Sequence, residues 1–153
     1  MPDLFSHLAT SRVPAAFLRD RRLQALLLFG SFLPDVASKT LYWVAWANSD
    51  YIEPFHSLTG LLILSYIVAL FFEEPLRKGA FAALYGGSLL HAALDLVKDN
   101  LGTGSASLLY PFSTRGFELG WIDPENVIWL IPAAAVLLLL VHGLERRYRR
   151  VPQ

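Results

Sequence analysis

The sharpest chemical signal in the sequence is a histidine and an aspartate four residues apart, His91 and Asp95, near the end of an apolar run. Residues at this spacing lie on one face of an α-helix, one turn from each other, so the imidazole and the carboxylate are close enough to hold one cation. Ionisable side chains inside a membrane helix are costly to bury and are by default functional candidates. A structural hydrogen bond between the two side chains, or solvation of the helix end, is the alternative interpretation.

Two further residues of the same chemistry lie at the ends of other apolar runs. Asp35 follows a Leu-Pro pair, where the chain is expected to leave its helix, and His56 opens the next run. A helix-ending aspartate and an interfacial histidine are the simpler interpretations of these positions. With His91 and Asp95, however, they supply two imidazoles and two carboxylates. This donor set favours zinc, with manganese as the alternative, and we expect a divalent metal site.

Composition limits the class of protein and the kind of site. Of the 153 residues, 54% are hydrophobic and 17% are charged, whereas an average soluble domain has about 25% charged residues. A disordered or nucleic-acid-coating protein is therefore excluded, and no nucleic-acid partner is expected. Because the chain has no cysteine, a thiolate zinc site and a thiol nucleophile are also excluded.

Four apolar runs are candidates for membrane-embedded helices: residues 23–33, 57–72, 80–94 and 127–144. About 20 helical residues are needed to cross a bilayer, so the first run either extends through the charged residues before it or stops at membrane depth. Residues 1–12 are expected to form a short amphipathic helix with Phe5 and Leu8 on its apolar side, and the aromatic run 41–47 an interfacial helix. The predicted fold class is all-α: a polytopic membrane helical bundle with about four membrane-embedded helices, as one integral-membrane domain over residues 1–153.

The placement of basic residues predicts the orientation. If all four runs cross the membrane and both termini are cytoplasmic, ten of the thirteen Lys and Arg residues lie inside, as the preference for cytoplasmic positive charge requires. The outer basic residues then include Lys39 and Arg115. The candidate metal site faces outward on this topology.

Five short motifs carry the candidate residues. They are Asp3-Leu-Phe-Ser-His7, Leu33-Pro34-Asp35, His56-Ser57, Gly87-Ser-Leu-Leu-His91-Ala-Ala-Leu-Asp95 and Pro111-Phe112-Ser113. In this order and spacing, from the N-terminus to Ser113, they resemble the YdjM-type metal-dependent hydrolases of the prokaryotic inner membrane. That family is similar in motif order to the zinc-dependent phospholipase C and S1/P1 nuclease enzymes. The resemblance implies ligand roles for His7, Asp35, His56, His91 and Asp95, around one to three ions.

His7 poses a geometric question. A cytoplasmic N-terminus would separate it from the other candidate ligands by the thickness of the membrane. His7 reaches them if the first run is a re-entrant or half-depth helix, or if the N-terminal helix lies on the outer side.

The expected chemistry is hydrolysis, because a divalent ion with an open coordination position activates water. Asp35 or Asp95 would bridge ions, orient the water or act as general base. The loop after Asp95 is expected to recognise substrate through Ser113 and Arg115, whose guanidinium suits a phosphate oxygen. A site at the membrane boundary suits a phosphoester of a lipid or lipid-linked molecule. The alternatives are a non-catalytic metal-binding or metal-handling membrane protein and a structural membrane adaptor.

Overall fold

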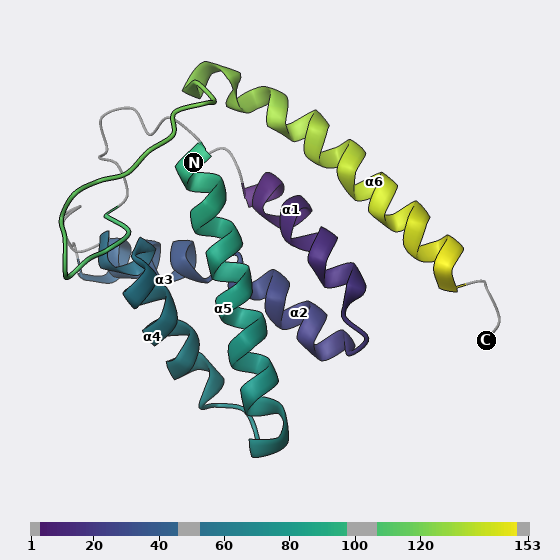
Figure 1. Ribbon diagram of the computed structural model, residues 1–153, viewed down its shortest axis with the longest axis horizontal. Helices are drawn as coiled ribbons and strands as arrows, with labels where there is room; N and C mark the ends of the chain where they lie inside the picture. Colours follow the sequence, from purple (N-terminus) through teal and green to yellow (C-terminus); the bar gives the residue numbers. More distant parts are fainter. Residues whose placement is uncertain (1–3, 46–52, 98–106, 150–153) are drawn as a thin grey trace.

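The computed structural model describes residues 4–45, 53–97 and 107–149, which are helical apart from turns and one long loop (Figure 1). These residues contain no β-strand beyond isolated bridge residues, so the predicted all-α class is confirmed for them. The helices are α1 (Leu4–Phe17), α2 (Arg21–Gly30), α3 (Leu33–Ala45), α4 (Leu58–Ala69), α5 (Glu74–Val97) and α6 (Leu130–Arg149), with the 3-10 helices η2 (Glu53–His56) and η3 (Pro124–Trp129).

Helix α5 is the centre of the fold. It packs against α2 and α4, and also contacts α1 and α3, while α1 packs in turn against α2 and α6 (Figure 1). Helices α1 and α2 form a hairpin, because only three residues separate them. The first turn of α1 and the last turn of α2 therefore lie at the same end of the hairpin.

Only one helix of the described ranges is both long and apolar enough to cross a membrane, and it is α5, with 24 residues. Helix α4 and residues 130–144 of α6 are apolar but shorter. The first predicted run corresponds to α2, whose 10 residues span about 15 Å at 1.5 Å per residue. That length is about half of a hydrocarbon core of about 30 Å. A bundle with four crossing helices therefore stays a prediction.

The interior contains small polar residues beside buried leucines such as Leu61 and Leu84, and many other large apolar side chains are exposed. Ser11, Ser65 and Ser88 are completely buried, whereas Phe17 and Phe71 are almost completely exposed. Small residues let helix backbones approach closely, and their enrichment at helix contacts is typical of helices that pack inside a membrane.

The structure contains the predicted N-terminal helix as α1. The helix is longer than predicted, and Phe5 lies on its exposed side while Leu8 is only half-buried. Its buried face consists of Ser6, His7, Ala9, Ser11 and Ala15. Small residues thus dominate the buried face of α1, whereas Phe5, on the expected apolar side, is exposed.

Two local predictions around α3 are corrected as well. Asp35 does not end a helix but lies in the first turn of α3, where the helix dipole favours a carboxylate. Residues 41–45 are the last turn of α3 rather than a separate interfacial helix, and the rest of that predicted helix, residues 46–47, lies outside the described residues.

Two glycines allow α2 and α5 to cross closely. A methyl group at Gly30 would overlap the carbonyl oxygen of Leu84, and one at Gly87 would overlap that of Leu27. Beside this contact, the Ser88 hydroxyl donates a hydrogen bond of 3.0 Å to the Gly30 carbonyl oxygen. The crossing thus fixes the end of α2 against the middle of α5.

We expect Gly87→Ala to lower the free energy of unfolding by about 1–3 kcal/mol, because the added methyl group must push the two backbones apart. Thermal or denaturant unfolding in detergent measures the change. Gly86→Ala is the matched control, since nothing lies within 4 Å of a Cβ at that position. An equal loss in both variants would contradict the close crossing.

Candidate metal centre

The structure brings together all five residues for which the sequence suggested ligand roles. We call them the His/Asp cluster: His7, Asp35, His56, His91 and Asp95. One donor atom from each of His7, His91 and Asp95 lies within 4.8 Å of the other two, and the same holds for Asp35, His56 and His91. His91 therefore belongs to both three-donor sets and is the centre of the cluster.

Each residue of the cluster is positioned by the end of a helix. His7 lies near the start of α1, Asp35 in the first turn of α3, and His56 at the end of η2, directly before α4. His91 and Asp95 lie in the last two turns of α5. The predicted convergence of helix ends is thus found.

His7 lies directly beside the residues of α5. Its Nε2 is 3.4 Å from Oδ1 of Asp95, and its ring stacks on that of His91 with centroids 4.1 Å apart and planes at 20°. The contact fits the alternatives in which the first run does not cross the membrane or the N-terminal helix lies on the outer side, and the membrane topology itself stays a prediction. The α1–α2 hairpin explains why His7 lies beside α5, because the end of α2 returns to the same end of the hairpin as the start of α1.

The orientation of His91 is fixed by a backbone carbonyl group. Its Nδ1 is 2.8 Å from the carbonyl oxygen of Ser31. A carbonyl oxygen only accepts hydrogen bonds, so Nδ1 carries the proton and Nε2 is the nitrogen available to a cation. Histidines that bind metals commonly donate their other ring N–H to such a group.

The other nitrogen of His91 faces a carboxylate without a hydrogen bond. Nε2 is 2.9 Å from Oδ2 of Asp95, yet it is buried and makes no hydrogen bond of good geometry to any described residue. The distance is short, but the direction is not that of an N–H donor. A lone pair facing a carboxylate oxygen is repulsive unless a cation lies between them. The donor set therefore fits a divalent metal ion.

Asp35 is held between two positively polarised neighbours. Its Oδ1 is 3.8 Å from Nε2 of His56, and its Oδ2 is 3.3 Å from Nζ of Lys39. Burial raises the pKa of the Asp35 carboxyl group, but the neighbouring side chains of His56, His91 and Lys39 lower it by more, so the pKa lies below its ordinary value. The group is ionised at neutral pH, as a metal ligand must be.

The serine of the His-Ser motif has a structural task. Ser57 caps α4: its hydroxyl oxygen accepts from the backbone N–H of Gly60 at 3.0 Å and its hydroxyl group donates to the Pro54 carbonyl oxygen at 2.7 Å. A side chain at Gly60 would overlap that same carbonyl group. The cap fixes the turn that carries His56.

The number of ions that the cluster can hold is limited by His91. Because its Nδ1 is bonded to Ser31, it offers one nitrogen, and one nitrogen binds one ion. His91 can thus complete only one of the two three-donor sets at a time. A second ion would depend on the remaining histidine and carboxylate of the other set.

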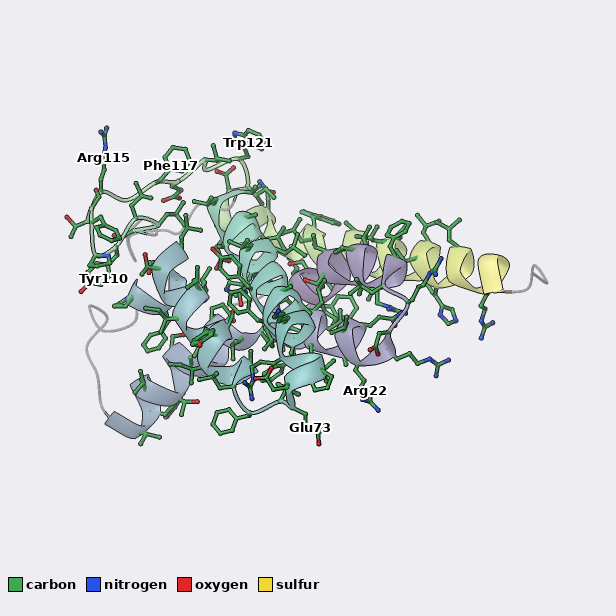
Figure 2. All side chains as sticks on the ribbon, turned by 60° about the horizontal axis from the view of Figure 1, so that its bottom comes forward. Arg22, Glu73, Tyr110, Arg115, Phe117 and Trp121 are labelled. Carbon is green, nitrogen blue, oxygen red and sulfur yellow. The ribbon has the colours of Figure 1, made fainter. Side chains whose placement is uncertain are left out.

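The contact that the structure describes for Ser113 and Arg115 lies within their own loop. Arg115 is exposed and points away from the helices (Figure 2). Ser113 accepts a hydrogen bond of 3.2 Å from the backbone N–H of Arg115, which is a local turn contact. Their substrate-binding roles stay predictions.

The loop that carries these two residues is attached to the helix ends of the cluster. Leu58 N–H, at the start of α4, donates to the carbonyl oxygen of Leu108, and Leu119 N–H donates to that of Leu96, at the end of α5. The loop therefore lies beside the helix ends that position His56 and Asp95.

The residues that sequence reasoning missed are those that hold the cluster rather than form it. The Ser31 carbonyl group orients His91, and Ser88 fixes the neighbouring turn of α2. Every residue type has a backbone carbonyl group, so the role of this one cannot be predicted from the sequence. Ser88, however, lies three residues before His91, and this spacing places both side chains on the same helix face. The spacing could have indicated that Ser88 contacts the same neighbouring helix as His91.

An all-helical fold with an apolar exterior and a buried His/Asp cluster at its helix ends defines a membrane-type bundle with a candidate metal centre. Residues 3–151 match the family model described as the YdjM inner membrane protein, and the chain belongs to this family. The match extends beyond Ser113 and includes α6, which the motif resemblance did not reach. No curated protein and no solved structure matches the chain. The family assignment confirms the expected inner-membrane class.

We expect purified protein without a His-tag to contain divalent metal in stoichiometric amount, and His91→Ala to lose most of it, because His91 belongs to both donor sets. Elemental analysis after a mild chelator wash measures this. His142→Ala is the control, since His142 is exposed on α6. Metal that is absent from the parent after repletion, or equal in all three proteins, would contradict the assignment.

Proposed function

We propose that this protein is a membrane-embedded metal-dependent hydrolase that cleaves a phosphoester of a lipid or lipid-linked substrate. The observation that carries the proposal is the convergence of four His and Asp side chains on a fifth, His91, whose Nε2 is buried and lacks a hydrogen bond within the described residues. A site of three or four protein donors leaves a coordination position open, as catalytic zinc sites do.

The chemistry follows from the donor set. When bound, a divalent ion lowers the pKa of a coordinated water molecule to about 7 and so supplies a nucleophile at neutral pH. Zinc suits the mixture of imidazole and carboxylate donors, and manganese is the alternative.

The protein residues divide into buried and accessible groups. His7 and His91 are buried, so they serve as positioning ligands. The side chains of Asp35 and Asp95 remain 14% and 24% exposed, which lets each reach water as well as the ion. We assign them the catalytic roles, with one carboxylate accepting the proton of the attacking water molecule.

The position of the cluster supports an amphiphilic substrate. The neighbouring loop presents the exposed aromatic side chains Phe112, Phe117 and Trp121, and aromatic rings are favoured at the headgroup level of a bilayer. Figure 2 shows this loop at the opposite side of the molecule from Arg22 and Glu73. A phosphoester at the membrane surface would thus lie within reach of the helix ends.

The test is hydrolysis by the detergent-purified, metal-repleted protein of a panel of phospholipids and lipid phosphates. We expect Asp95→Asn to lower the rate by about 10²–10⁴-fold, the usual contribution of a positioned acid–base group, and His142→Ala to leave it unchanged. Stoichiometric metal without hydrolysis of any phosphoester would contradict the proposed enzymatic activity and favour the alternative of a non-catalytic metal-binding protein. Absence of metal would contradict both of these functions and favour the alternative of a structural membrane adaptor.

A further inference from the structure

A lysine lies at the edge of the His/Asp cluster and contacts one of its carboxylates. Lys39 follows Asp35 by one turn of α3, and its Nζ is 3.3 Å from Oδ2 of Asp35. The lysine side chain is 42% exposed, whereas that of Asp35 is 14% exposed. The ammonium group therefore lies between the buried donors and the solvent.

Lys39 and a metal ion would compete for the same carboxylate. Asp35 belongs to a three-donor set with His56 and His91. Its Oδ1 faces His56, while its Oδ2 is paired with Lys39. A divalent ion at that set takes up the negative charge of Asp35 and repels the neighbouring ammonium group. Lys39 then needs another anionic partner, and its exposed, flexible stem lets it reach one.

The charge count indicates which anion fits. The charges of three neutral imidazoles, two carboxylates and one divalent ion sum to zero. With the ammonium group of Lys39 included, the net charge of the site is therefore one positive charge. A phosphodiester group carries one negative charge, and the lysine ammonium group binds phosphate oxygens as a point charge.

We propose that Lys39 is a substrate-binding residue whose ammonium group binds a non-bridging oxygen of a phosphodiester at the metal-loaded His/Asp cluster. This inference rests on the proposed function and narrows its substrate class from phosphoesters to monoanionic diesters. If Lys39 served only as a helix ion pair with Asp35, it would contribute a little stability and nothing to phosphate binding.

The experiment compares Lys39→Met, Lys39→Arg and the parent, all loaded with zinc in detergent. Lys78→Met is the matched control, because Lys78 is an exposed lysine in the first turns of α5, far along that helix from Asp95. Binding of dimethyl phosphate and of short-chain phosphatidylglycerol below its micellar concentration is measured by calorimetry. Zinc affinity is measured separately by competition with a chelator.

We expect Lys39→Met to weaken binding of both diesters by about 10- to 100-fold, the usual contribution of a hydrogen bond to a charged group. Lys39→Arg, which keeps the charge, should restore most of the affinity, and Lys78→Met should change nothing. Zinc affinity in Lys39→Met should be equal to that of the parent or higher, since a competing cation has been removed. Tighter binding of the lipid than of dimethyl phosphate, still dependent on Lys39, assigns the diester to a lipid headgroup, whereas equal binding assigns it to the phosphate group alone.

Unchanged diester binding in zinc-loaded Lys39→Met would overturn the role of Lys39 while leaving the proposed hydrolase intact. A loss of zinc in the same variant would overturn it too, because Lys39 would then act only by holding Asp35. Absence of zinc from the parent would overturn both proposals.

Discussion

The end of helix α2 is held against α5 by hydrogen bonds to two consecutive backbone carbonyl groups, and the candidate metal centre depends on this contact. Ser88 donates to the Gly30 carbonyl group, and His91 donates to that of Ser31. Carbonyl groups at the end of a helix lack partners within their own helix, so both bonds satisfy groups that would otherwise be buried without one. The glycine contact brings the backbones close enough for these bonds, and the tautomer of His91 follows from the second of them.

Much of the candidate site could be predicted from the sequence, because His and Asp side chains stand out in an otherwise apolar chain. The His91–Asp95 spacing identifies one helix face without further information, and Asp35 and His56 stand out as ionisable groups at the ends of apolar runs. His7 was different: no local pattern connects it to α5, and charge placement alone argued against the contact. Only the packing of the α1–α2 hairpin decides its position.

The fold was predicted at the level of class but not in its packing. Apolar runs locate α4, α5 and α6, because a continuous apolar stretch is a strong pattern. The buried face of α1 was not predicted, because it consists of small residues and one histidine. Small buried residues of this helix, such as Ser11 and Ala15, form no strong hydrophobic stripe. The end of α2 and the start of α3 are set by a turn between Gly30 and Leu33. The residue types in this turn do not predict where it begins and ends.

The loop over the helix ends is attached through its main chain. The bonds from Leu58 to Leu108 and from Leu119 to Leu96 join backbone groups only, so they do not depend on which side chains the loop presents. Residues such as Phe112 and Arg115 can therefore change without releasing the loop or disturbing the His/Asp cluster. Such a division separates the side chains that the loop presents from the backbone contacts that hold it beside the donor residues.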